Sequence, residues 1–120
     1  MRISPEAKLV PVPVHIERVR QRGYNQAKLI ADALAQRRGL SVDDVLTRRK
    51  PTLQQHRLDR AARLRNLRGA FELKPDREPP KAAILVDDIL TTSATLEACA
   101  VVLRAAGAER VLGFAIAREV

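Results

Sequence analysis

The sequence predicts an α/β fold in which helices flank a parallel β-sheet. Residues 82–86 form an unbroken apolar run, Ala-Ala-Ile-Leu-Val, which is typical of a strand buried on both faces of a parallel sheet. Residues 96–106 follow with the pattern of a helix, and residues 111–117 form a second apolar strand. This alternation of strand, helix and strand favours parallel strands joined by right-handed crossovers.

The charge of the chain is strongly basic and unevenly distributed. The 120 residues, enough for one domain, carry a net charge of +8. Residues 1–70 hold 16 Lys and Arg against 6 Asp and Glu, a balance of +10, whereas residues 71–120 hold 6 against 8, a balance of −2. A chain of this charge attracts anions such as nucleotides, sugar phosphates and nucleic acid. The plain alternative is a solvated surface rich in arginine.

The first part of the chain is expected to form one strand and one helix. Residues 9–14 alternate apolar residues with proline. Because proline has no N–H to donate, we expect a strand end or an edge strand here. Residues 25–38 are expected to form a helix that ends at Gly39. Its buried face repeats at helical spacing: Ala27, Ile30, Ala31 and Leu34.

Two short strands, at residues 45–48 and 70–73, are expected to frame a long basic segment. That segment, residues 50–68, is polar and rich in arginine. Strands on both sides of it suit a hairpin whose loop closes over a ligand. The alternative is a solvated basic connection.

The most distinctive stretch joins the strand at 82–86 to the helix at 96–106. Asp87 and Asp88 follow the strand, and small and hydroxyl residues open the helix. A helix N-terminus presents free N–H groups and partial positive charge, which suit a phosphate, while paired acids suit sugar hydroxyls or hydrated Mg²⁺. The stretch therefore predicts a site for a phosphorylated sugar. The alternative is an ordinary strand–turn–helix with Thr92 or Ser93 as the helix cap.

The same stretch, residues 85–95, resembles the motif with which type I phosphoribosyltransferases bind 5-phosphoribosyl-1-pyrophosphate (PRPP). The resemblance implies that Asp87 and Asp88 bind the ribose and reach Mg²⁺, the expected cofactor, through water. It assigns the 5-phosphate to five residues: Thr91, Thr92, Ser93, Ala94 and Thr95. The sequence departs from the motif at Ser93, where that family usually has glycine.

An upstream pair of stretches resembles the ComF/GntX branch of phosphoribosyltransferase-like proteins. These are Val-Pro-Val-Pro at residues 10–13 and Arg-Gly-Tyr-Asn-Gln-Ala at residues 22–27. The resemblance implies that Arg22 and Gly23 bind the pyrophosphate of PRPP. An arginine and a flexible glycine before a helix start are physically suited to that task. The alternative is a turn in which Asn25 caps the helix.

The basic segment also resembles ComF-type proteins in the spacing of Gln54, Arg63, Asn66 and Phe71. In the wider superfamily this position holds a flexible hood loop. The resemblance therefore implies a hood that closes over the ligand, with three residues expected to act there: Arg60, Arg63 and Asn66.

The resemblance extends over residues 9–118 and implies a single phosphoribosyltransferase-like domain at residues 1–120. ComF-type proteins commonly begin with a four-cysteine zinc ribbon and further residues before the Val-Pro-Val-Pro strand, and this sequence shows neither. We therefore expect one face of the sheet to be incompletely covered, which pairing into a homodimer would remedy. The sequence shows no signal peptide and no long apolar run, and Cys99 is its single cysteine, so we expect a cytoplasmic protein with no membrane partner.

Three functions stay open. The first is a phosphoribosyltransferase with an unidentified acceptor. Purine-salvage relatives have an aspartate that handles a proton of the base where this sequence has Thr91, so no catalytic residue is assigned. The second is a non-catalytic module that binds PRPP or a nucleotide and is associated with competence and DNA uptake. The third is a protein that binds single-stranded DNA through its basic half, although the scarcity of aromatic residues argues against base stacking.

Overall fold

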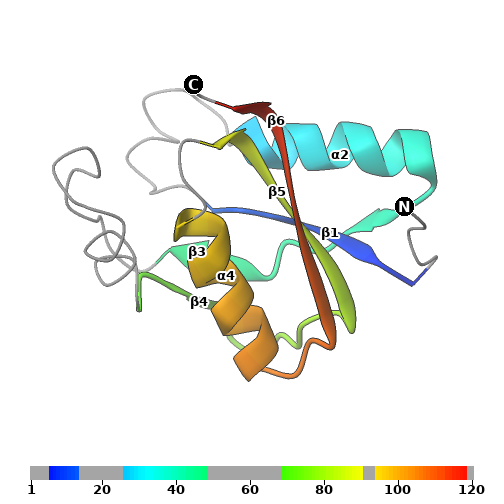
Figure 1. The fold of residues 1–120 in the computed structure, drawn as a ribbon. Coiled ribbons are helices and arrows are strands. Elements are labelled where there is room, and N and C mark those ends of the chain that lie inside the picture. The colour runs from blue at the N-terminus through cyan, green and yellow to red at the C-terminus, as the bar shows by residue number, and fades with distance from the viewer. Residues whose placement is uncertain (1–5, 14–25, 49–68, 91–93, 119–120) are drawn as a thin grey trace, which may run out of the picture.

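The computed structural model describes residues 6–13, 26–48, 69–90 and 94–118 (Figure 1). Within these parts, strands and helices alternate along the chain. In chain order the elements are β1 (Lys8–Pro11), α2 (Gln26–Arg38), β2 (Ser41–Val42), β3 (Leu46–Arg48), β4 (Phe71–Leu73), β5 (Ala82–Leu90), α4 (Ala94–Ala105) and β6 (Arg110–Arg118).

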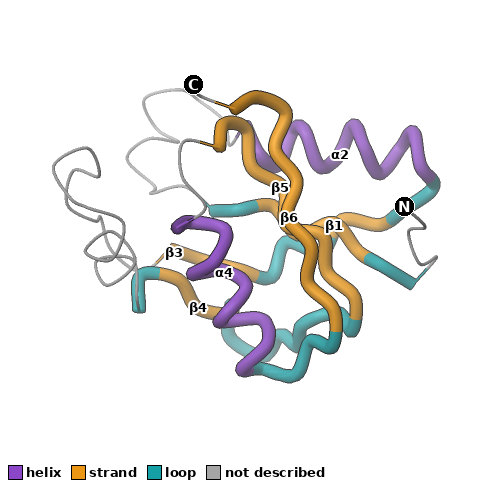
Figure 2. The backbone as a smooth tube through the Cα atoms, viewed as in Figure 1, coloured by secondary structure: helices purple, strands orange, loops and turns teal. Residues whose placement is uncertain are grey.

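Four of the strands form a parallel sheet in the order β2-β1-β5-β6 (Figure 2). Its register places Leu9 between Val42 and Ile84, and Ile84 in turn lies beside Leu112. β3 and β4 pair antiparallel in a separate two-stranded ribbon. The predicted α/β fold with a parallel sheet and flanking helices is therefore confirmed, and the two short strands pair with each other as expected.

β5 is the central strand of the core, and its two faces serve two different hydrophobic clusters. Ala83 and Leu85 join the cluster that includes α4 and the β3–β4 ribbon. Ile84 and Val86 join the cluster that includes α2. Because successive side chains of a strand point to opposite faces, this alternation covers both sides of the sheet. The expectation of a strand buried on both faces is confirmed, since all four residues are buried.

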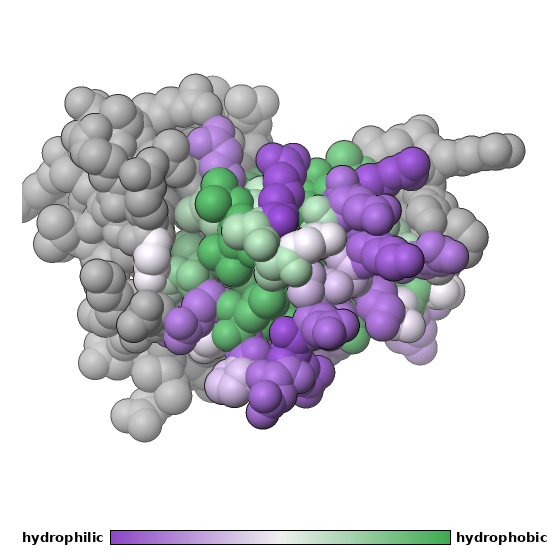
Figure 3. All heavy atoms as spheres, turned by 90° about the horizontal axis from the view of Figure 1, so that it is seen from below, coloured by the Kyte–Doolittle hydropathy of each residue, from purple (hydrophilic) through white to green (hydrophobic). Residues whose placement is uncertain are grey.

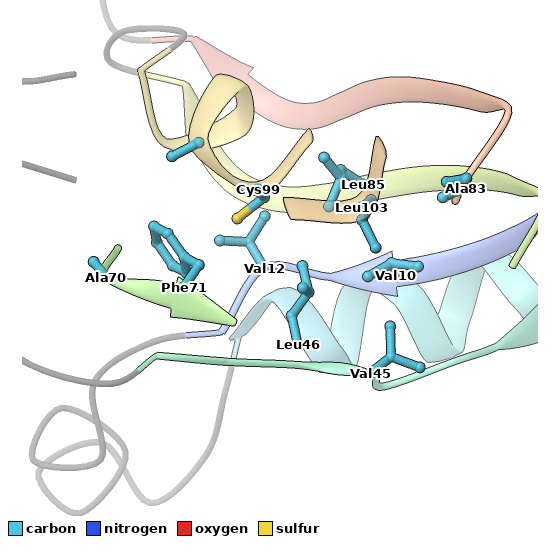
Figure 4. Packing of buried hydrophobic residues seen from close by; sticks show 12 residues of the cluster. Val10, Val12, Val45, Leu46, Ala70, Phe71, Ala83, Leu85, Cys99 and Leu103 are labelled. Carbon is cyan, nitrogen blue, oxygen red and sulfur yellow. The ribbon is translucent and has the colours of Figure 1, made fainter. Parts of the chain in front are cut away.

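The larger cluster lies between the sheet and a second layer made of α4 and the ribbon. Figure 4 shows Val10 and Val12 of the first strand segment facing Cys99 and Leu103 of α4. Phe71 of β4 is its one aromatic member among the buried residues described. The core is therefore mainly aliphatic, and its stability depends on the close packing of branched side chains.

β1 decides between the two positions expected for the proline segment, a strand end or an edge strand. It is not an edge strand, because it lies inside the sheet between β2 and β5. The strand does end at Pro11. Leu9 accepts a hydrogen bond from Asp43 on the β2 side, and Val12 donates one to Val86 on the β5 side, both at 2.8 Å. Backbone N–H groups along a strand point alternately to its two neighbours, so an N–H at Pro11 would point toward β2. The pairing of β1 with β2 ends at Leu9 and Val42, so the N–H that proline lacks is not needed there.

β5 and α4 differ from their expected bounds at the junction between them. The apolar run 82–86 is only the first part of β5, which continues through Asp87 and Asp88 to Leu90. The extension occurs because β6 is equally long and pairs with it, for example Asp87 with Ala115. α4 begins at Ala94, two residues earlier than the pattern predicted. Tertiary pairing therefore overrides the local end of the apolar pattern.

Candidate functional site

The connections of the sheet define one edge where a ligand site is expected. From β1 the chain runs through α2 to β2 on one side, and from β5 it runs through α4 to β6 on the other side. The two helices pack on opposite faces of the sheet (Figure 1). In open parallel sheets, ligands bind outside the carboxyl ends of the strands at the point where the connections diverge. Here that point lies between the carboxyl ends of β1 and β5, where Pro11 pairs with Val86.

Asp87 lies at this point of divergence. It directly follows Val86 in β5 and is half-buried. Strand alternation places its side chain on the same face as Leu85, which is the α4 side of the sheet. The Asp87 carboxylate therefore lies where the carboxyl ends of the strands meet, on the face of the sheet that packs against α4.

The pKa of the Cys99 thiol is affected by burial and by two nearby charges. Burial is the main cause that raises the pKa of its thiol above the usual value; the Asp87 carboxylate raises the pKa further, and the Arg48 guanidinium opposes them. The side chain is fully buried. The thiol is therefore protonated at neutral pH, which excludes it as a nucleophile there. The charges of Asp87 and Arg48 therefore both lie within electrostatic range of the Cys99 thiol.

Arg48 is a component of this region that the sequence reasoning did not single out. It is the last residue of β3 and pairs with Phe71 across the ribbon. Its guanidinium carbon lies 5.4 Å from the centroid of the Phe71 ring, a cation–π contact. It shares a ribbon face with buried Leu46, so the charge is on the core-facing side. The alternation Leu-Thr-Arg was the signal that could have revealed it, because it puts an arginine on an apolar face.

The sequence of this chain is similar to those of several known proteins. The chain is 35% identical over 117 residues to competence protein F of Haemophilus influenzae, a match that covers 95% of this chain and 51% of that protein. It is 34% identical over 112 residues to the DNA utilization protein YhgH of Salmonella typhi, covering 92% and 49%. It is 31% identical over 113 residues to competence protein ComFC of Streptococcus pneumoniae, covering 94% and 49%.

This chain belongs to the ComF family. The resemblance to that family inferred from the Val-Pro-Val-Pro and Arg-Gly-Tyr-Asn-Gln stretches is thus confirmed. The chain spans about half the length of the curated relatives it matches. No family model matches it.

The described part of the ComF-family chain brings three components of the expected site to one edge. Asp87 lies at the end of β5, α4 begins at Ala94 only four residues after that strand, and half-buried Thr95 is in the first turn of the helix. Asp88 is also part of β5, but its side chain lies outside the described residues. The remaining expected site residues likewise lie outside them: Arg22, Gly23, Arg60, Arg63, Asn66, Thr91, Thr92 and Ser93.

The flanks of those undescribed segments lie in informative places. The chain that leads to Arg22 leaves β1 at the carboxyl edge, where Val12 bonds to Val86. The segment that holds Arg60 follows Arg48, the last residue of β3. The charges of Arg48 and Asp87 both affect the pKa of Cys99. The first of these segments therefore departs from the end of the ComF-family fold that carries the acid.

The described parts of the chain offer neither a cluster of metal-binding side chains nor a membrane-spanning helix. They contain no group of three or more His, Cys, Asp and Glu side chains able to hold a metal ion. Neither described helix is long and apolar enough to cross a membrane.

Proposed function

We propose that this chain binds PRPP together with Mg²⁺ at the carboxyl edge of β1 and β5, as part of a protein that serves competence and the use of DNA. The observation that supports this most strongly is the position of Asp87. A carboxylate stands at the point of divergence of a parallel sheet, and a helix N-terminus begins a few residues later. The names of the relatives support the biological context.

The two ends of the proposed ligand require opposite kinds of groups. The 5-phosphate would lie at the start of α4, where the helix dipole and unpaired N–H groups favour an anion and the hydroxyls of residues 91–95 add donors. The ribose hydroxyls would donate to Asp87 and Asp88. This arrangement separates the carboxylates from the phosphate by the length of the turn between β5 and α4.

Mg²⁺ fits this edge as a hydrated ion and not as an ion enclosed by protein ligands. Mg²⁺ usually keeps several waters and takes one or two carboxylates together with ligand phosphates. Asp87 is half-buried and therefore retains access to water. When bound, the ion would neutralise charge on the pyrophosphate, while Asp87 and Asp88 would orient it through water.

Basic groups would complete the proposed site. The Arg48 guanidinium, held against Phe71, is one of these basic groups: like the Asp87 carboxylate, it affects the pKa of the Cys99 thiol. Arg22, Gly23 and the hood residues Arg60, Arg63 and Asn66 would contact or cover the pyrophosphate. The excess of +10 on residues 1–70 supports this assignment of the basic segments to the anionic end of the ligand.

Transfer of the phosphoribosyl group is the catalytic form of the proposal. The bond from C1 to pyrophosphate breaks through an oxocarbenium-like state, so the protein need supply no nucleophile. Its residues would hold the 5-phosphate, position the ribose and stabilise the leaving charge. In this step the acceptor atom would form the bond to C1 as pyrophosphate leaves. Thr91 has no basic group to take a proton from the acceptor, so the acceptor would have to attack without a proton to lose or give that proton to another base.

The test is a calorimetric titration with PRPP in the presence and absence of Mg²⁺. We expect saturable binding that depends on Mg²⁺ and raises the unfolding temperature of the chain. Absence of binding in both conditions contradicts the proposal. Release of pyrophosphate with candidate bases then separates a transferase from a binding module: bound PRPP that stays intact with every base indicates the module.

Binding of single-stranded DNA is a second candidate, favoured by the basic first part of the chain and by relatives named for competence and DNA utilization. It predicts that affinity for a single-stranded oligonucleotide falls steeply as salt is raised, because phosphate contacts release counterions. Competition by Mg²⁺-PRPP would locate such DNA at the same edge. DNA affinity unchanged by PRPP would place it elsewhere.

A further inference from the structure

An apolar groove lies between α4 and β6 and runs along α4 from its first turn to its last. Its volume is about 460 Å³, and buried Leu85 forms part of its floor. Its walls come from the two elements: Leu96, Glu97, Ala100, Val101 and Arg104 of α4, and Val111, Leu112 and Gly113 of β6. Seen from below, the molecule has an area of contiguous apolar side chains bordered by charged ones (Figure 3). The groove is large enough to receive several side chains of another helix.

The margin of the sheet beside this groove is incompletely covered in the described parts of the chain. β6 is the outermost strand there, and α2 packs on β1 and β5. On the groove side, Val101 of α4 is 62% exposed. Leu112 and Phe114 are 45% and 41% exposed, but they pair with Ile84 and Val86 and therefore point to the other face of the sheet. Val101 and the apolar lining of the groove form one continuous apolar surface, which marks an interaction site more often than a single exposed side chain does.

The outer side of α4 has a charge pattern that is complementary to itself. Glu97 stands in the first turn and Arg104 in the last. They are seven residues apart, about two helical turns, and both line the groove. Ala100 and Val101 lie between them. A second copy turned by a two-fold axis through this midpoint would place each Glu97 opposite the other copy's Arg104.

We propose that two copies of this chain form a symmetric dimer in which their α4 helices pack antiparallel, with the β6 margins on either side. The small Ala100 side chain lets the helices approach closely, and Val101 enters the groove of the other copy. The arrangement buries the apolar centre and leaves the two ion pairs at the rim, as is usual for interfaces. A nucleic acid is a poor occupant of this groove, because the Glu97 carboxylate repels phosphates and Val101 presents an apolar surface to them.

The test is sedimentation equilibrium of the complete chain over a concentration series from about 1 μM to about 200 μM. We expect a mass of twice 13.3 kDa at the upper end. Val101→Lys should raise the dissociation constant at least about tenfold, because it places a charge at the centre of the contact. Leu29→Lys is the matched control: Leu29 is 52% exposed on α2, and this variant should dimerise like the parent.

A charge exchange tests the antiparallel geometry separately. Glu97→Arg alone and Arg104→Glu alone should each weaken the dimer, and the double variant should restore it. Thermal unfolding shows whether each variant is folded, because these changes oppose the helix dipole. A parent chain that stays monomeric throughout overturns the dimer, including the case in which another polypeptide covers the groove. A folded double variant that is no tighter than the single variants overturns the antiparallel pairing.

Discussion

At the residue scale, three ionisable side chains characterise the region of the candidate site: Asp87, Arg48 and Cys99. Asp87 lies at the carboxyl edge, Arg48 is stacked on Phe71, and the buried Cys99 thiol is influenced by both charges. A charge on the core-facing side of a ribbon is costly unless opposite charge or solvent compensates it. The Phe71 ring contacts the Arg48 guanidinium, and Asp87 lies at the edge where an anionic ligand and its metal ion are proposed to bind.

The proposed ribose contact is tested by removing its charge. Asp87→Asn and Asp88→Asn should each weaken Mg²⁺-PRPP binding by about tenfold or more, since a charge-assisted hydrogen bond contributes about 1.5–3 kcal/mol. Titration calorimetry measures the loss. Asp32→Asn makes the same chemical change in the exposed Lys28–Asp32 pair of α2, 3.2 Å apart, and should leave binding unchanged. Full affinity in both Asp87→Asn and Asp88→Asn would remove these residues from the site.

The buried thiol predicts a specific dependence of stability on pH. Its pKa in the unfolded chain is the ordinary 9.0 and is raised by folding, so the folded state holds the proton more tightly. The free energy of unfolding is therefore unaffected by this group below pH 9 and falls as pH rises above 9, by at most about 1.4 kcal/mol per pH unit.

Urea unfolding of the parent and of Cys99→Ala at pH 8 and pH 10 measures this contribution, since the difference between the two proteins cancels the groups they share. The parent should lose more stability over this interval than the variant does. Equal losses in the two proteins would show that the thiol does not contribute.

At the element scale, α4 has two roles on two sides. Ala98, Cys99 and Leu103 face the sheet and the ribbon, and all are buried. Glu97, Val101 and Arg104 line the opposite groove. The helix ends at Ala105, and Gly107 turns the chain after it with a φ of 119°, which is readily adopted only by glycine. Ala108 then donates a 3.0 Å hydrogen bond to the Leu103 carbonyl. One helix thus anchors the core and presents a surface.

The anchoring side of α4 is tested by Leu103→Ala. Leu103 is fully buried in the larger cluster, so truncation should lower the free energy of unfolding by about 2–5 kcal/mol through lost burial and the cavity left behind. Leu29→Ala truncates a half-exposed leucine and should cost less than about 1 kcal/mol. Denaturant unfolding of both variants checks this, and similar losses would mean that the cluster does not carry the stability.

At the scale of the whole molecule, the order β2-β1-β5-β6 explains why the site can lie where it does. β1 is followed by its neighbour β2 on one side and β5 by its neighbour β6 on the other, so the two crossovers diverge at the carboxyl ends of β1 and β5. Asp87, the start of α4 and the chain that follows β1 all border that space. The proposed dimer surface lies on α4 and β6, and it approaches the proposed ligand edge at the first turn of α4, where Glu97 follows Thr95.

The sequence by itself determined the elements and the chemistry of the candidate site. The apolar run 82–86, the helical spacing of Ala27, Ile30 and Ala31, and the glycines at 39 and 107 carry local information, because they depend on residue type and periodicity. Only the tertiary structure decided that β1 is internal, that β5 extends through Asp87, and that the charge of Arg48 lies within electrostatic range of Cys99. These outcomes depend on pairing and packing between residues far apart in the chain, which no local pattern encodes.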